Sequence, residues 1–401
     1  MSSSTDPAAA ARPSVPAINP LQALTRFGQS VWLDYIRRSL LTSGELKRLI
    51  EQDGLRGMTS NPAIFEKAIA GSTDYSQALA ALAGRPGLDA KAIYEQLAIR
   101  DIQDAADALR RVYDQTSRRD GYVSLEVSPY LAHKTQETID EALRLWKAVG
   151  RENLMIKVPG TVEGIPAVRQ LIGRGINVNV TLLFAQDVYE EVAEAFISGL
   201  EDLAQRGGDV SRVASVASFF VSRIDTLIDG ELAGRIQGAA SPEECALLPG
   251  LEGKVAIANA KLAYRKYREI FSSPRWQALA RSGAQTQRLL WASTSAKNPA
   301  YRDVLYVEEL IGPDTVNTIP PATFDAFRDH GVPRASLEED VAAAQRTMED
   351  LARAGISIKK VTDQLTEDGV RLFADAFDKL LAAVATQSKR SASPSAGQAG
   401  R

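Results

Sequence analysis

Lys157 interrupts an apolar segment of the sequence, residues 154–160, which reads LMIKVPG. Apolar surroundings disfavour the ammonium form of a lysine, and a free amine can attack a carbonyl carbon to form a Schiff base. The alternative is a structural lysine whose aliphatic stem packs against its neighbours while the ammonium group reaches solvent. The segment by itself leaves both interpretations open, so other residues must decide between them.

Two carboxylates end similar segments. Asp34 closes the apolar residues 31–33, and Glu126 lies in SLEV, residues 124–127. Asp34 could exchange a proton with a substrate hydroxyl, as cleavage of an aldol carbon-carbon bond requires, or it could cap a turn. Glu126 could pass protons to water during formation and hydrolysis of an imine, or form a buried ion pair with Lys157. These two roles of Glu126 are compatible, because an acid beside an amine shifts the pKa of both groups.

Amide and hydroxyl side chains follow two further segments. Asn61 precedes Pro62 in TSNP, residues 59–62, a pattern typical of a helix N-cap followed by proline at the first helical position. Residues 177–181, NVNVT, alternate so that Asn177, Asn179 and Thr181 share one face of a strand. These polar groups either hydrogen-bond within the fold or contact a polyhydroxylated substrate.

Two segments have the composition of an anion site. Residues 217–223, ASFFVSR, lead from a predicted strand into a predicted helix and offer Ser218 and the Arg223 guanidinium. Residues 291–299, WASTSAKNP, likewise continue from the end of a predicted strand and offer small hydroxyl residues and Lys297. Both cations could instead be ordinary solvated charges in loops that precede helices.

All these positions lie at or near the ends of short apolar segments that alternate with longer amphipathic ones, the pattern of repeated βα units around a parallel sheet. The predicted strands span residues 31–36, 57–60, 122–127, 154–159, 176–184, 213–219, 288–292 and 315–319. About eight such strands close a TIM barrel, in which reactive groups gather at the C-terminal ends of the strands. We therefore predict an α/β fold, a (β/α)8 barrel.

The intervals 62–121 and 221–287 are longer than one crossover helix needs, so they predict helical insertions. Residues 336–387 predict a C-terminal helical extension with a break at residues 354–357. Residues 1–18 and 388–401 are rich in small and polar residues, and we expect them to be disordered tails. A single barrel domain would then span residues 19–387.

The composition excludes several classes of protein. The 47 basic and 50 acidic residues nearly cancel, so the basic surface that duplex nucleic acid requires is missing. One cysteine and two histidines leave little material for a disulfide or a transition-metal site. No apolar run approaches the ~20 residues of a membrane helix, and the first residues do not resemble a secretory signal. We expect a soluble, cytoplasmic, metal-independent protein, monomeric or homodimeric, with small molecules as partners.

Taken together and in order along the chain, these motifs resemble those of the transaldolase family in its longer form, over roughly residues 20–385. The resemblance implies a Schiff-base aldolase in which Lys157, on the fourth strand, is the nucleophile. It makes Asp34 the general acid and base for carbon-carbon cleavage. Glu126 would act through a water molecule that Thr181 positions.

The resemblance also implies substrate-binding roles. Asn61 and Asn179 would bind substrate oxygens, and Phe220 would line the pocket. Ser218 and Arg223 would hold the phosphate. Shorter transaldolases carry an arginine in an ASFR segment after the seventh strand, whereas this chain has ASTS at residues 292–295 and runs on to Lys297. We assign Lys297 to the second phosphate contact, although a lysine cannot form the bidentate fork of an arginine.

The implied reaction transfers a dihydroxyacetone unit from sedoheptulose 7-phosphate to glyceraldehyde 3-phosphate, giving erythrose 4-phosphate and fructose 6-phosphate in the non-oxidative pentose phosphate pathway. It needs no cofactor or metal. One rival is a fructose 6-phosphate aldolase that uses the same lysine and releases free dihydroxyacetone. Another is a non-catalytic barrel that binds sugar phosphates. Chain length and the segments of Asn61 and Glu126 favour transfer.

Overall fold

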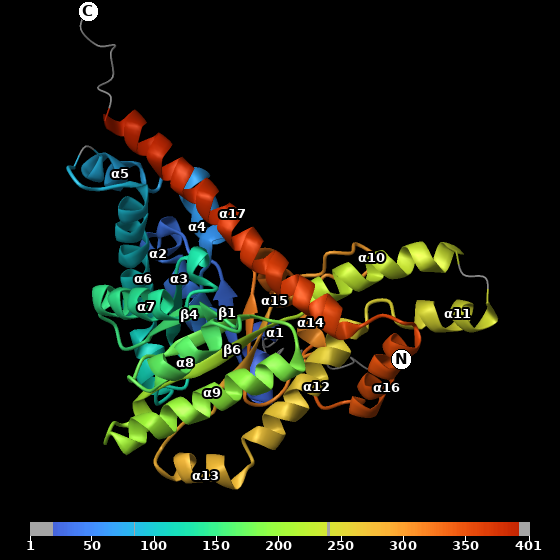
Figure 1. Ribbon diagram of the computed structural model, residues 1–401. Helices are drawn as coiled ribbons and strands as arrows, with labels where there is room; N and C mark the ends of the chain where they lie inside the picture. Colours follow the sequence, from blue (N-terminus) through green and yellow to red (C-terminus); the bar gives the residue numbers. More distant parts are fainter. Residues whose placement is uncertain (1–18, 84, 239–240, 393–401) are drawn as a thin grey trace, which may run out of the picture.

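The computed structural model describes residues 19–83, 85–238 and 241–392, and its centre is a closed barrel (Figure 1). The eight strands pair in sequence order, and every neighbouring pair is parallel. They are β1 (Gln29–Asp34), β2 (Gly57–Thr59), β3 (Tyr122–Glu126), β4 (Leu154–Pro159), β5 (Val178–Leu183), β6 (Ser215–Phe220), β7 (Arg288–Ala292) and β8 (Thr315–Ile319). The predicted (β/α)8 barrel is confirmed.

The strands differ from the prediction only at their ends, and β1, β2, β3 and β5 stop one or two residues earlier than predicted. β1 begins at Gln29 and not at residue 31, because Gln29 pairs with Thr315 of β8 and its side chain donates to the Leu310 carbonyl oxygen at 2.7 Å. β5 begins after Asn177, whose side-chain amide donates to the Leu154 carbonyl oxygen at 3.0 Å. β6 runs over residues 215–220 rather than 213–219. β4, β7 and β8 begin and end where predicted.

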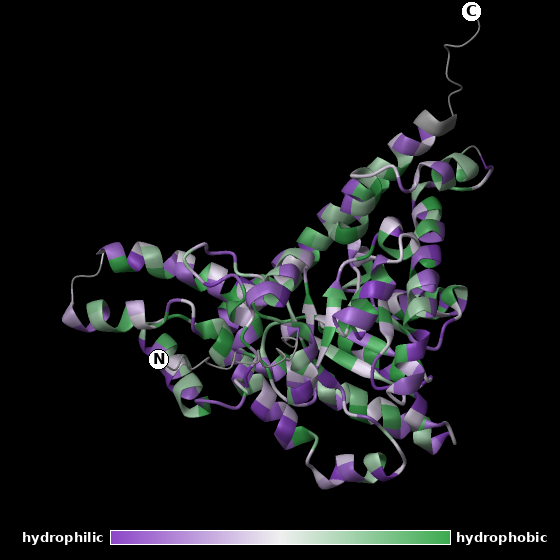
Figure 2. Cartoon of the chain, turned by 180° about the vertical axis from the view of Figure 1, so that it is seen from behind, coloured by the Kyte–Doolittle hydropathy of each residue, from purple (hydrophilic) through white to green (hydrophobic). Residues whose placement is uncertain are grey.

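Helices follow the strands and cover the outside of the barrel. The helices outside the two long intervals and the C-terminal extension are α1 (Pro20–Ala23), α2 (Arg38–Thr42), α3 (Glu45–Gln52), α7 (Thr135–Val149), α8 (Gly164–Ile172), α9 (Gln186–Gln205), α14 (Leu305–Glu308) and α15 (Pro321–His330). Hydrophobic residues concentrate toward the barrel, and polar residues mark the outer helices (Figure 2). No helix in the described ranges has both the length and the apolar composition needed to cross a membrane.

Both long intervals contain the predicted helical insertions. The first consists of α4 (Pro62–Ala70), α5 (Ser76–Leu82) and α6 (Ala90–Gln115). The second consists of α10 (Ser222–Gly238), α11 (Pro242–Leu247), α12 (Val255–Ile270) and α13 (Pro274–Arg281). α4 and α10 start directly after β2 and β6, so each insertion begins at the C-terminal face of the barrel.

The C-terminal extension consists of α16 (Val341–Arg353) and α17 (Ile358–Ala392), which are separated at the predicted break. Gly355 adopts a φ of 74° there, a conformation that glycine tolerates without steric cost. α17 crosses the barrel from the side of α10 to the side of α5 (Figure 1). It continues through Ala392, so the predicted tail boundary at residue 388 is too early. The predicted tail at residues 1–18 and residues 393–401 lie outside the described residues.

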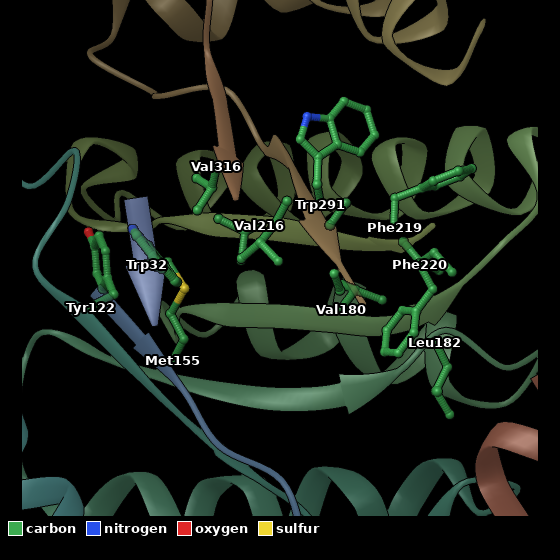
Figure 3. Packing of buried hydrophobic residues seen from close by; sticks show 14 of the residues in the cluster. Trp32, Tyr122, Met155, Val180, Leu182, Val216, Phe219, Phe220, Trp291 and Val316 are labelled. Carbon is green, nitrogen blue, oxygen red and sulfur yellow. The ribbon is translucent and has the colours of Figure 1, made fainter. Parts of the chain in front are cut away.

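Tight packing closes the N-terminal end of the barrel. The Trp32 ring lies near Tyr122 and Met155 (Figure 3), and a Cβ atom at Gly57 would lie 2.5 Å from this ring. The Trp32 indole donates to Asp120 at 3.2 Å, and Arg288 pairs with Asp120 at 2.9 Å in the same buried network. Because this end is filled, a substrate can enter only from the other end.

Candidate active site

A cavity of about 440 Å³ opens at the C-terminal ends of the barrel strands. Most of the predicted site residues line it: Asp34, Asn61, Lys157, Thr181, Ser218, Phe220, Arg223 and Lys297. The other two, Glu126 and Asn179, do not line the cavity. They are the register neighbours of Lys157 on β3 and β5, so they form the wall beside it.

Lys157 lies on β4, whose residues are all buried, and its own side chain is 5% exposed. The interpretation as a lysine that reaches solvent is therefore wrong. The amine Nζ donates to the Ser60 carbonyl oxygen at 3.2 Å and lies 3.2 Å from Glu126 Oε2. The β3–β4 register sets this second contact, because side chains of directly paired residues project from the same face of the sheet.

Glu126 forms the buried ion pair with Lys157 that was one of its two predicted roles. Burial raises the pKa of Glu126 to about 7, although the adjacent Lys157 ammonium opposes the shift. A carboxyl group that titrates near neutral pH can both accept and donate a proton under ordinary conditions. A cavity of about 20 Å³ lies on another side of Glu126, between α6, α7 and α17.

Asp34, the last residue of β1, brings a second carboxylate into the cavity. The Thr59 hydroxyl donates to Asp34 Oδ1 at 2.6 Å, and Thr59 is the register neighbour of Asp34 on β2. Burial raises the pKa of Asp34, while the charge of Lys157 and the Thr59 hydrogen bond oppose the shift. Its interpretation as a turn cap is not supported, since the side chain faces the cavity.

The polar residues of β5 lie in two different environments. Asn179 is held within the wall, where its amide donates to Ser124 Oγ at 3.0 Å and accepts from Ser218 Oγ at 2.7 Å. Thr181 lines the cavity, and its buried Oγ1 makes no hydrogen bond to any described residue. The predicted common face of these residues therefore holds, but only Thr181 presents a free polar atom to the cavity.

Asn61 combines both predicted interpretations. It is the N-cap of α4, since its side-chain oxygen accepts from the Ile64 N–H at 3.0 Å, and Pro62 follows at the first helical position. The same residue lines the cavity.

Both predicted phosphate-binding cations, Arg223 and Lys297, line the cavity. Arg223 belongs to the first turn of α10, and its guanidinium lies 5.2 Å from the centre of the Phe220 ring. Lys297, in the loop after β7, donates to Ser295 Oγ at 2.5 Å. Burial lowers the pKa of both side chains, and for Lys297 the nearby Arg223 charge adds to the effect. Neither cation forms an ion pair with a carboxylate of the described residues, so their charge is available to an anion.

Comparison with known proteins places this arrangement in a family. The family model for transaldolase/fructose-6-phosphate aldolase matches residues 31–384. A protein of Nostoc sp. named transaldolase 2 is 50% identical over 91% of this chain and 96% of its own length. Transaldolases of Trichodesmium erythraeum and Thiobacillus denitrificans are 49% and 46% identical, over 90% and 92% of this chain and 96% and 100% of their own lengths.

The chain belongs to the transaldolase/fructose-6-phosphate aldolase family. The resemblance inferred from the motifs is confirmed, and relatives named transaldolase make the chain an enzyme of the transaldolase family. Within the described residues, no group of three His, Cys, Asp or Glu side chains is placed to hold a metal ion.

Sequence reasoning missed several residues of this transaldolase-family cavity. Thr59 and Thr318 line it, and their hydroxyl groups lie 2.6 Å apart. Both are polar residues inside strands, so the rule that found Asp34 could have found them. Lys67 of α4 and Phe373 of α17 also line the cavity. No sequence signal separates these two from other helical residues, because only the packing of the helices brings them to the barrel.

The geometry predicts how the pKa of Glu126 depends on Lys157. Lys157→Met keeps an apolar chain of similar length but removes the charge that opposes burial, so the pKa of Glu126 should rise above about 7 by about 1 or more. Carboxyl carbon NMR titration, with Glu126→Gln to assign the signal, measures this value. Lys359→Met, which removes an exposed partner of Asp363, is the matched control and should leave the Glu126 titration unchanged. A lower or unchanged value in Lys157→Met would contradict the ion pair.

Proposed function

We propose that the chain is a transaldolase that transfers a dihydroxyacetone unit through a Schiff base on Lys157. The donor is sedoheptulose 7-phosphate and the acceptor is glyceraldehyde 3-phosphate, as in the non-oxidative pentose phosphate pathway. The observation that carries the proposal is the buried Lys157 amine, 3.2 Å from the Glu126 carboxylate, in a cavity that also holds the Asp34 carboxylate and the cations Arg223 and Lys297.

The first step forms the imine. The Lys157 amine attacks the C2 carbonyl of the ketose, and the resulting carbinolamine loses water. Glu126 passes the protons through a water molecule that Thr181 holds. The raised pKa of Glu126 and the unpartnered Thr181 hydroxyl support these roles.

The second step breaks the carbon-carbon bond. Asp34 takes the proton from the C4 hydroxyl, the C3–C4 bond breaks, and its electron pair moves through C2 to the iminium nitrogen. The aldose phosphate leaves, and the three-carbon unit stays on Lys157 as an enamine. Burial supports this role, because an aspartate with a raised pKa is a stronger base for the hydroxyl proton. The enamine carbon then bonds to the aldehyde carbon of the acceptor, and the aldehyde oxygen takes up a proton. Hydrolysis of the new imine frees the product.

The remaining residues bind the substrate in this proposal. Asn61 binds its oxygens, and Phe220 lines the pocket. Asn179, which was expected to bind substrate directly, instead positions the Ser218 hydroxyl from within the wall. Ser218, Arg223 and Lys297 hold the phosphate, which is supported by the absence of carboxylate partners for the two cations among the described residues. No step requires a cofactor, a metal, a membrane or nucleic acid. A cytoplasmic location and a monomer or homodimer belong to the same proposal.

Product analysis tests transfer against its rivals. The protein is incubated with fructose 6-phosphate, with and without erythrose 4-phosphate, and sugars are quantified by mass spectrometry. We expect sedoheptulose 7-phosphate to form only with the acceptor, while free dihydroxyacetone stays minor. Equally fast release of dihydroxyacetone without acceptor would identify an aldolase. No turnover under either condition would favour the non-catalytic barrel.

Arg223→Ala tests the phosphate assignment. Loss of a hydrogen bond to a charged group should lower kcat/KM for phosphorylated sugars on the order of 10- to 100-fold, with little change for unphosphorylated analogues. Arg235→Ala is the matched control, because Arg235 lies on the same helix but does not line the cavity. If Arg223→Ala discriminates between phosphorylated and free sugars as well as the wild type does, Arg223 does not bind the phosphate.

A further inference from the structure

One face of the C-terminal helix α17 packs against the rest of the protein along most of its length. Gly369, Phe373 and Phe377 follow one another at intervals of four residues, which places them on the same face of a helix. Phe373 and Phe377 are buried, whereas Leu372, the neighbour of Phe373 in sequence, is 50% exposed. α17 therefore has a defined inner face, and Phe373 lies in its middle.

Two contacts fix this face over the barrel. Gly369 lies so close to Leu182, at the end of β5, that a Cβ atom at residue 369 would be 2.8 Å from the leucine side chain. Phe377 packs between Tyr94 and Tyr130, with ring centres 5.8 and 6.3 Å away. Phe373, one turn from each contact, is thereby held at the barrel mouth.

The position of Phe373 relative to the reactive amine is specific. Its side chain lines the same cavity as Lys157 and Asp34, and the Lys157 Nζ atom lies 5.5 Å from the centre of its ring. Phe373 itself is 6% exposed. An apolar ring thus covers the amine on the side of the mouth, whereas Glu126 contacts the amine from the barrel wall.

We propose that Phe373 is a specificity-determining residue that favours transfer of the dihydroxyacetone unit over its release by hydrolysis. The inference rests on the proposed function, because it concerns the enamine on Lys157. The ring excludes water from the mouth side of the enamine until the acceptor occupies that space. The wall side keeps the Glu126 contact that imine formation and hydrolysis require.

The two fates of the enamine differ in one step. In transfer, the enamine carbon bonds to the aldehyde carbon of the acceptor, the aldehyde oxygen takes up a proton, and the larger imine is hydrolysed to the new ketose phosphate. In release, the same carbon takes a proton instead, and water then adds to C2 and the C–N bond breaks. Dihydroxyacetone leaves, and the free Lys157 amine returns. A ring that keeps water and its protons from the carbon slows only the second route.

The ratio of free dihydroxyacetone to sedoheptulose 7-phosphate, formed from fructose 6-phosphate at saturating erythrose 4-phosphate, measures this partition. We expect Phe373→Ala to raise the ratio about tenfold. Phe373→Leu keeps part of the apolar cover and should raise the ratio about threefold. This second variant serves as the test if the alanine variant does not fold.

Leu380→Ala is the matched control, because it removes a buried apolar side chain from the same face of α17 but lines neither the cavity of Lys157 nor the smaller cavity beside Glu126. The ratio of dihydroxyacetone to sedoheptulose 7-phosphate in this control variant should equal that of the wild type. An unchanged ratio in both Phe373 variants would overturn the inference. An equal rise in Leu380→Ala would also overturn it, because the effect would then come from the packing of α17 as a whole. A wild-type protein that makes no sedoheptulose 7-phosphate would instead refute the proposed function.

Discussion

Lys157 and Glu126 lie 3.2 Å apart inside the barrel wall, and both side chains are removed from water. Burial of either charge alone costs several kcal/mol, so each group can remain there only because the other is present. Transfer of one proton from the Lys157 ammonium to the Glu126 carboxylate turns the pair into a free amine and a neutral acid, with no proton gained or lost. The raised pKa of Glu126, about 7, makes this transfer easier than it would be to an ordinary carboxylate. The proposed chemistry depends on this shared proton, and the barrel register that pairs residues 126 and 157 provides the contact.

The pairing of the barrel strands also positions the other polar side chains around the cavity. Asp34 is held by its register neighbour Thr59, and Asn179 links Ser124 on one side to Ser218 on the other. These hydrogen bonds connect side chains of five strands, β1, β2, β3, β5 and β6. The filled N-terminal end leaves the C-terminal end as the entrance, and there the cations Arg223 and Lys297 add positive charge. A substrate that carries a carbonyl and a phosphate fits this distribution of charge.

The strands and most of the cavity could be predicted because they depend on local features: short apolar segments separated by amphipathic ones, with polar residues at the segment ends. Lys157 could not be assigned from its own segment, and only burial in the closed barrel excluded a solvated ammonium group. The start of β1 at Gln29 was missed because side-chain hydrogen bonds extend the strand. Lys67 and Phe373 were missed because they reach the cavity through the packing of α4 and α17, which lie far apart in sequence. Such long-range packing leaves no periodic pattern in the sequence.

Borohydride trapping tests the central claim most directly. The protein is treated with fructose 6-phosphate and sodium borohydride, which reduces an imine to a stable secondary amine, and the modified peptide is mapped by mass spectrometry. The account predicts one dihydroxyacetone-derived adduct on Lys157, and none in a folded Lys157→Ala variant. An adduct on another lysine of the cavity, such as Lys67 or Lys297, or an unmodified protein at saturating substrate would contradict it.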